Sequence, residues 1–548
     1  MPVISKFKKI ISLCMVLLLL VAITAPRSYA AVNGYTASDV VGQPDFSSTD
    51  CASGLTGYCS SWASDTAVDT VHHRLFMGDY SNSRVLVYQL DSSDRFTDSV
   101  PHTPTYVLGQ PDLVSNFYNN NCSQADTNQA TTCEPYGIVY DSKNNRLFVE
   151  NISRISVFDL SSGISNGMDA SYVIGQPDFT TDDYGLTQNR FCSVYGGIAL
   201  DEQGGFLYVN DPGCYRVLVF NVNPGYISNG MDASNVIGQS TFTSNDLPIG
   251  NATSSIDSYY GGIVFDNVQK RLFAVDGNAY DRIMVYDMSH GVTDNMPASY
   301  VIGQPDFSAY NSGCSANSFG YLSGIGYDQK NQELFGQDPQ CRRVLIFDLS
   351  NGITNGMDAS MVIGQTDFNS GENLDPSQTR FGGPWDANLA FSNNSNTFYF
   401  VDGDLNRTLL FNFVKINQDS LPNFSLNQHY SQNITTSYSQ GAVTYSVSSG
   451  ALPPGLTLDS TTGLISGTPN VAGSYTFSIT AKDDNGSIGY YKDTNTYTLS
   501  LAINSPNTGF GSKDNNPIIL TAIYIISGVY LLSTLVIYMI KKRIFYIG

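Results

Sequence analysis

The chain has 548 residues and a formal net charge of -21, with 42% hydrophobic and 14% charged residues. The length predicts several domains, and the composition is that of a globular protein rich in Tyr. Nucleic-acid binding needs a basic face, and Lys and Arg are few outside the two ends of the chain. The charge therefore argues against a nucleic-acid partner.

Residues 1–30 have the pattern of a secretory signal. Lys6, Lys8 and Lys9 give the positive start, residues 10–25 the apolar stretch, and residues 28–30 a small-x-small cleavage site. We expect cleavage and export, with an uncleaved membrane anchor as the alternative.

A Gly-Gln pair recurs six times at steps of 61 to 67 residues, at Gly42, Gly109, Gly175, Gly238, Gly303 and Gly364. Each period contains four short apolar runs in the same order, such as GIVYD, RLFVE, RISVF and YVIGQ within residues 137–176. The runs are rich in Val, Ile, Phe and Tyr and are bounded by turn residues, which predicts strands. Four strands per repeat and six repeats predict an all-β fold with a six-bladed β-propeller over residues 31–416.

The order of the runs predicts how the ring closes. The sixth unit ends with its third strand, residues 409–413, whereas the exported chain begins with an isolated fourth strand at residues 35–46. If the two pair, the sixth blade is complete and two exposed strand edges are covered.

Two stretches carry a family resemblance, LFMGDYSNSRVLVYQL at residues 75–90 and FYFVDGDLNRTLLFNF at residues 398–413. They resemble NHL repeats, in which an apolar strand, an Asp, a short turn with Asn, an Arg and a second apolar strand follow one another. The resemblance implies a propeller over about residues 32–415. It does not select a function, because such propellers serve as enzymes, sensors and binding platforms.

Eight Cys remain after the signal, and an even number in an exported chain predicts disulfides. In a propeller, the loop into a first strand lies on the same face as the loop between the second and third strands. This geometry predicts Cys192–Cys214 and Cys314–Cys341, and proximity predicts Cys51–Cys59 and Cys122–Cys133. Metal ligation is the alternative, but the spacings fit no zinc pattern.

The period ends near Asn417. Residues 443–486 contain LPPGL, TGLISGTP and GSYTFSITAKD in this order. This stretch resembles the Ig-like modules of bacterial surface proteins, which implies a small β-sandwich at residues 417–503. We expect this module to be a spacer.

The end of the chain resembles a sortase sorting signal. Residues 504–516 form a linker with the motif Ser505-Pro506-Asn507-Thr508-Gly509, residues 517–540 an apolar span, and residues 541–548 a basic tail. A sortase would cut between Thr508 and Gly509, although the usual motif has Leu in the place of Ser505. Without cleavage, the chain is a single-pass membrane protein with the same part outside the cell.

Catalytic motifs do not emerge from the sequence. The five His residues do not recur at equivalent positions, and the repeated Asp residues are better explained as turn caps and partners of the repeated Arg. Calcium binding by the SNGMDAS-type loops is an alternative to simple turns. We expect no cofactor and no metal.

One pattern suggests a binding surface. An aromatic residue precedes each first strand, in the set Trp62, Tyr136, Tyr195, Tyr260, Tyr321 and Trp385. Around a channel mouth these rings could bind a sugar or apolar side chains, or they could simply pack between blades. The first function hypothesis is a surface-anchored adhesion module for an extracellular protein or glycan. The alternative is an exported lyase or glycan-active enzyme on the same scaffold.

Overall fold

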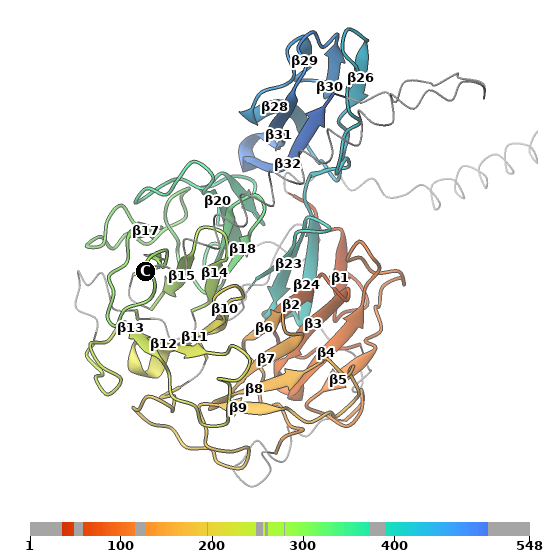
Figure 1. Ribbon diagram of the computed structural model, residues 1–548. Coiled ribbons are helices and arrows are strands. Elements are labelled where there is room, and N and C mark those ends of the chain that lie inside the picture. Colours follow the sequence, from red (N-terminus) through yellow and green to blue (C-terminus); the bar gives the residue numbers. More distant parts are fainter. Residues whose placement is uncertain are drawn as a thin grey trace, which may run out of the picture.

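The computed structural model describes residues 35–48, 58–115, 128–193, 195–247, 256–257, 261–278, 280–371 and 389–501. These residues form antiparallel sheets and four single-turn 3-10 helices, η1 (Tyr80–Asn82), η2 (Pro212–Cys214), η3 (Gly403–Leu405) and η4 (Gly486–Ile488). Six of the sheets have four strands each and follow one another along the chain (Figure 1).

The first five sheets each use four consecutive strands. The first contains β2 (Ala63–Asp69), β3 (Arg74–Asp79), β4 (Arg84–Gln89) and β5 (Tyr106–Leu108). The second contains β6 (Ile138–Asp141), β7 (Arg146–Asn151), β8 (Arg154–Asp159) and β9 (Tyr172–Ile174). The third contains β10 (Ile198–Asp201), β11 (Phe206–Asp211), β12 (Arg216–Asn221) and β13 (Asn235–Ile237). The fourth contains β14 (Ile263–Asp266), β15 (Arg271–Asp276), β16 (Arg282–Asp287) and β17 (Tyr300–Ile302). The fifth contains β18 (Ile325–Asp328), β19 (Glu333–Asp338), β20 (Arg343–Asp348) and β21 (Met361–Ile363).

The sixth sheet takes one strand from the start of the chain. Its order is β1-β24-β23-β22, with β22 (Ala390–Ser392), β23 (Thr397–Asp402), β24 (Arg407–Asn412) and β1 (Asp39–Val41). Asp39 lies opposite Leu410 and Val41 opposite Thr408. The predicted pairing of the N-terminal strand with the last third strand is therefore confirmed.

The first strands of the six sheets are neighbours in space. β2 contacts β6, β6 contacts β10, β10 contacts β14, β14 contacts β18, β18 contacts β22, and β22 contacts β2. The approach is close enough that a Cβ at Gly326 would lie 2.6 Å from the carbonyl oxygen of Leu389. Larger side chains are thus excluded at this position.

Polar side chains just after the first strands join successive sheets. Glu202 accepts a hydrogen bond from the N–H of Ser142 at 3.3 Å, and Asn267 accepts one from the N–H of Glu202 at 3.0 Å. Gln329 continues the series by accepting one from the N–H of Asn267 at 2.9 Å. The second, third, fourth and fifth sheets are therefore joined in series at this end.

The repeated SNGMDAS-type loops, between third and fourth strands, have a structural role of the same kind. Asn166 in the second sheet accepts a hydrogen bond from the N–H of Val107 in the first, and the N–H of Gly167 donates to the oxygen of Val107. The same bond, from the N–H of a Val to a side-chain oxygen of the loop, occurs at three more junctions: Val173 with Asn229, Val236 with Asp294, and Val301 with Asn355. Each loop thus holds the fourth strand of the preceding sheet.

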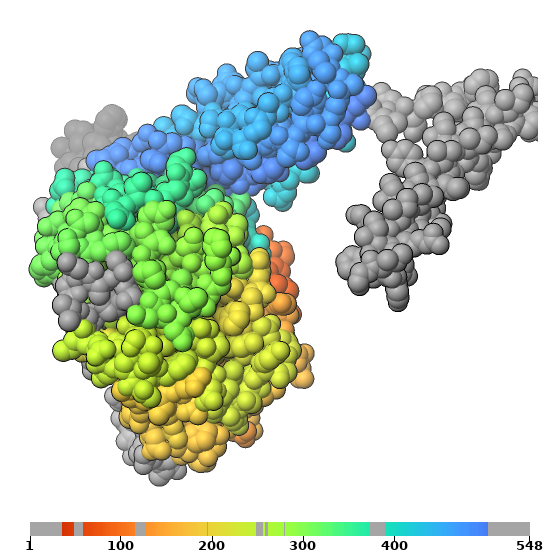
Figure 2. Space-filling model, turned by 60° about the vertical axis from the view of Figure 1, so that its left-hand side comes forward, coloured from red at the N-terminus to blue at the C-terminus, as the bar shows by residue number. Residues whose placement is uncertain are grey.

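A separate β-domain follows the sixth sheet. It contains β25 (Lys415–Ile416), β26 (Tyr430–Asn433), β27 (Thr436–Ser437), β28 (Ala442–Gly450), β29 (Leu456–Leu458), β30 (Leu464–Gly467), β31 (Ser474–Asp484) and β32 (Tyr490–Ser500). The strands form the sheets β25-β27, β26-β30-β29 and β28-β31-β32. One apolar core runs from the fourth, fifth and sixth sheets into this domain, with Phe413 and Tyr491 stacked at a centroid distance of 4.0 Å. Figure 2 shows the domain lying against the sheets.

The predicted secretory signal, sorting motif, apolar span and basic tail lie outside the described residues. Within the described ranges, no helix is long and apolar enough to cross a membrane.

Candidate functional site: an aromatic rim

The two ends of the six sheets carry different loops. In an antiparallel sheet, the turns after the first and third strands lie at one end. The C-terminal domain binds there, since the Tyr491 hydroxyl donates to Asp328 at the end of β18 and Lys492 pairs with Asp348 at the end of β20. We call this the domain end. The turn after each second strand and the loop entering each first strand lie at the opposite end, which we call the rim end.

A buried Asp–Arg pair marks the rim end of five sheets. The Asp ends the second strand and the Arg begins the third, in the pairs Asp79–Arg84, Asp211–Arg216, Asp276–Arg282, Asp338–Arg343 and Asp402–Arg407. The N–O distances lie between 2.6 and 2.9 Å. The second sheet has Asn151 in the place of the Asp, and there Arg154 lies 4.0 Å from Asp182.

The pairs hold the loops that carry the aromatic residues. The carboxylate of Asp79 accepts a hydrogen bond from the N–H of Ser61, next to Trp62, and that of Asp338 accepts one from the N–H of Tyr321. The Arg of these pairs also reaches the loop after the fourth strand. The guanidinium of Arg282, for example, donates to the oxygen of Phe307 at 2.6 Å. One ion pair thereby fixes two loops, which explains why Asp and Arg recur with the repeat.

Three of the predicted aromatic residues form a continuous set of rings. Trp62 and Tyr80 have centroids 6.2 Å apart, Tyr80 and Tyr136 6.3 Å, and Tyr136 and Tyr195 5.7 Å. Tyr80 lies in η1 and was not among the predicted residues. Its place in the turn after a second strand was the available signal, because that turn shares the rim end with the first-strand loops. We call Trp62, Tyr80, Tyr136 and Tyr195 the aromatic rim.

Burial differs sharply within the rim. The exposed fraction is 39% for Trp62 and 8% for Tyr136, whereas Tyr80, Tyr195 and the more distant Tyr321 are half-buried. Each of the two roles considered for these rings, ligand binding and packing between blades, therefore suits a different ring. Tyr136 packs between sheets, and Trp62 is exposed to solvent.

Trp62 is held in an unusual backbone conformation. Its φ is 55°, a left-handed value that costs free energy for a bulky residue. The N–H of Trp62 donates to Asn406 of the sixth sheet at 2.6 Å, and its oxygen accepts from the N–H of Tyr80 in the first sheet at 3.0 Å. Strain retained by two neighbouring sheets is typical of a functional position.

Acidic groups flank the rim. Glu134 accepts a hydrogen bond from the Tyr80 hydroxyl at 2.8 Å. On the other side, a Cβ at Gly403 would lie 3.5 Å from the indole of Trp62, and the exposed Asp404 is the next residue in the chain. Partial burial and the nearby Asp402 raise the pKa of Asp404, with Arg342 opposing. The rim thus combines an exposed Trp with acidic residues in the adjoining loops.

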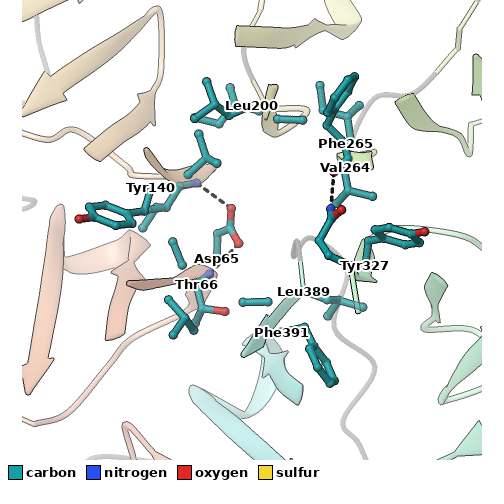
Figure 3. A pocket seen from close by; sticks show the side chains of 18 of the residues that line it. Asp65, Thr66, Tyr140, Leu200, Val264, Phe265, Tyr327, Leu389 and Phe391 are labelled. Atoms are coloured by element: carbon teal, nitrogen blue, oxygen red, sulfur yellow. Dashed lines mark hydrogen bonds between the residues drawn. The ribbon is translucent and has the colours of Figure 1, made fainter. Parts of the chain in front are cut away.

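A cavity of about 230 Å³ lies among the first strands and takes residues from all six sheets (Figure 3). Its wall combines apolar side chains of the first strands with the polar side chains of Asp65, Thr66, Glu202, Asn267 and Gln329. The carboxylate of Asp65 accepts hydrogen bonds from the N–H groups of Thr66 at 2.6 Å and Ile138 at 2.7 Å, and Asp65 is 1% exposed. Asp65 therefore joins the first and second sheets and is not accessible to a ligand.

The remaining predicted site residues divide into two groups. Cys192–Cys214 and Cys314–Cys341 are disulfides, as predicted. Cys192, Cys214 and Asp211 lie close enough to suggest a metal site, but the disulfide removes both thiolates as ligands. Cys59 is also in a disulfide. Tyr260, Trp385, Cys51, Cys122 and the sorting residues Pro506, Thr508 and Gly509 lie outside the described residues, so neither the Cys51–Cys59 nor the Cys122–Cys133 pairing is tested.

Comparison with known proteins identifies one part of the chain. Residues 412–502 match the family described as Putative Ig domain, He_PIG. The C-terminal domain is therefore Ig-like. Its first strand, β25, precedes the predicted boundary at residue 417 and pairs with β27. The comparison with curated proteins gives no match.

Proposed function

We propose that this protein is a cell-surface binding protein whose aromatic rim takes an extracellular ligand. In this proposal the six sheets form a closed six-bladed propeller of the NHL type. The cyclic contacts of the first strands and the pairing of β1 with β24 support closure.

The exposure of Trp62 carries the proposal. An exposed indole, with Glu134 bonded to the neighbouring Tyr80 and Asp404 following Gly403, suits a pyranose ring, whose C–H face stacks and whose hydroxyls donate hydrogen bonds. A protein ligand presenting an apolar side chain and a donor has the same chemistry. The inaccessible Asp65 in the central cavity favours binding at the rim over catalysis in the channel.

The position of the Ig-like domain supports surface display. It binds the domain end, which is opposite the rim end. The proposed anchor is the apolar span 517–540, or a covalent bond through Thr508 if a sortase cleaves the motif. If a sortase acts, wall digestion should release the wild type from cells, whereas only detergent should release a Thr508→Ala variant. Identical release of both would leave a plain membrane anchor.

The binding proposal is tested on glycan and extracellular-protein arrays with the full-length protein. Trp62→Ala should weaken binding by about tenfold or more, as expected for an aromatic residue at the centre of a contact. The matched control is Tyr226→Ala, because Tyr226 is 66% exposed but lies in a loop at the domain end. Equal binding by wild type and Trp62→Ala would refute the rim as the site.

A further inference from the structure

The junction between the fifth and sixth sheets lacks the loop that joins the other sheets. In the second to fifth sheets, a loop after the third strand holds the fourth strand of the preceding sheet, as in Asn355 with Val301. The sixth sheet has no such loop, because β1 comes from the N-terminal part and the chain leaves β24 for the Ig-like domain. The fifth sheet's outer strand therefore needs another partner.

The Ig-like domain occupies the place of the missing loop. Gly489 forms a β-bridge with Met361 at the start of β21, and the N–H of Tyr490 donates to the oxygen of Ser360 at 2.9 Å. Next to this contact, Lys330 pairs with Asp493 at 2.6 Å. The domain is thus fixed on the fifth sheet by backbone and charged contacts.

The same domain also reaches the closing strand. Gln440 makes two hydrogen bonds with the backbone of Thr36, accepting from its N–H and donating to its oxygen, both at 3.0 Å. The hydroxyl of Tyr35 donates to the oxygens of Asn412 at 3.0 Å and Tyr438 at 3.3 Å. The segment before β1 is therefore held by β24 on one side and by the Ig-like domain on the other.

The contact extends across the seam, which we define as the contact between the sixth and the first sheet. The ring of Tyr438 lies under the guanidinium of Arg95, at 4.2 Å from its centroid, and Arg95 belongs to the first sheet's loop after β4. Arg95 in turn donates to the oxygen of Ser395 in the sixth sheet at 3.0 Å. One loop of the Ig-like domain, residues 438–441, thus contacts both sides of the seam.

The loop itself is rigidly placed. The N–H groups of Gln440 and Gly441 donate to the buried carboxylate of Asp483 in β31, at 3.0 and 2.8 Å. Tyr438 has a left-handed φ of 65°. Because this loop is fixed to β31, its hydrogen bonds to Thr36 can hold the closing strand in place against the Ig-like domain.

We propose that the Ig-like domain is a clasp that fastens the closing strand β1 and the seam, in addition to any role as a spacer. It spans three consecutive sheets, the fifth, sixth and first. If the contacts of residues 438–441 are lost, β1 should detach from β24 before the remaining sheets unfold. The proposal concerns the fold and is independent of any ligand.

The test is amide hydrogen exchange in the full-length chain, followed by mass spectrometry. Combining Tyr438→Ala with Gln440→Ala should make peptides over residues 35–46 exchange roughly tenfold faster, as expected for the loss of one or two hydrogen bonds. Peptides over β9 and β13, the fourth strands of the second and third sheets, should keep the wild-type rate.

The matched control is Gln428→Ala, an exposed Gln in the same domain and away from the seam. It should leave residues 35–46 unchanged. Equal exchange of the double variant and the control, or equal acceleration in every sheet, would overturn the clasp. If the double variant does not fold, Tyr35→Phe removes one hydroxyl and should accelerate the same peptides by roughly threefold.

Discussion

The rim end and the domain end of the six sheets are built from the same repeat but fixed in different ways. At the rim end, each buried Asp–Arg pair holds loops of its own sheet, so the residue before each first strand can vary. At the domain end, Glu202, Asn267 and the repeated Asn residues join one sheet to the next. The bonds between sheets thus repeat from junction to junction at the domain end, whereas at the rim end they differ between junctions, as in Trp62 with Asn406 and Tyr80 with Glu134.

The largest expected effect comes from removing the strand that joins the two ends of the repeat. A chain without residues 35–46 loses β1 and leaves the edge of β24 unpaired. We expect loss of the cooperative thermal transition, measured by circular dichroism. A chain beginning at Val32 is the control and should melt like the wild type. A sharp transition in the shortened chain would contradict the closing role of β1.

The rim end should then respond strongly to loss of one buried pair. Asp338→Ala leaves Arg343 buried without its carboxylate and removes the acceptor of the Tyr321 N–H, so we expect a loss of about 3–5 kcal/mol in the free energy of unfolding. The control pair is Asp183 with Arg190, at 3.7 Å and with Asp183 62% exposed. Asp183→Ala should cost less than about 1 kcal/mol. Similar losses in urea denaturation would show that burial of the pair is unimportant.

The repeat explains why much of this architecture could be predicted from the sequence. All six third strands begin at the repeated Arg, and β1 pairs with β24 as expected. These features depend on local periodicity and on strand order. The Cys pairs could be predicted because the loop order of a repeated sheet places both loops at one end.

Contacts between different elements could not be predicted in the same way. Tyr80 joins the rim through ring packing across sheets, and the first sheet has an irregular register between Ala63 and Thr66. The Ig-like module was expected to be a spacer, yet Tyr491 is buried against Phe413. Such contacts depend on side chains far apart in the sequence, which carry no periodic signal.

Disulfides should reinforce the loops of the rim end. Cys192–Cys214 joins positions 22 residues apart and fixes the loop that carries Tyr195. Replacing both Cys by Ala should lower the free energy of unfolding by about 2–4 kcal/mol. Cys314–Cys341 fixes the corresponding loop of the fifth sheet and serves as a parallel case. Unchanged stability of the wild type on reduction, in the same denaturation assay, would argue against both bridges.

The seam at the domain end should depend on pH through His102. This buried ring lies 2.9 Å from Asp39 of β1 and 2.8 Å from Asp98. Burial lowers the pKa of His102, but the hydrogen bonds and charges of the two Asp residues outweigh burial, so its net pKa is raised. For Asp98, burial raises the pKa, and the hydrogen bonds from His102 and the Thr103 N–H outweigh it, so its net pKa is lowered.

The signs of these shifts define a pH window. The contribution of His102 is complete below its unfolded pKa of about 6.5 and is lost as the pH rises through the folded value. The contribution of Asp98 is present above about pH 4 and is lost at lower pH. Because Asp98 is 47% exposed, we expect only about 1 kcal/mol in total. The stability advantage of the wild type over His102→Gln should shrink as the pH rises above about 6.5. Exposed His290→Gln is the control, and a constant advantage of the wild type would refute the assignment.

The smallest expected effect isolates the backbone strain at the rim. Since Trp62 has a φ of 55°, a Gly there adopts the conformation without the penalty that a Cβ imposes. Trp62→Gly should therefore be more stable than Trp62→Ala by about 1 kcal/mol, although both lack the ring that the proposed ligand needs. Tyr321 precedes β18 at the equivalent position but is not among the residues with positive φ, so there the order should reverse, with Gly less stable than Ala. The measurement is urea denaturation of the four variants. If Gly and Ala rank the same way at both positions, Trp62 is not strained, and the strain argument for a functional role of this residue fails.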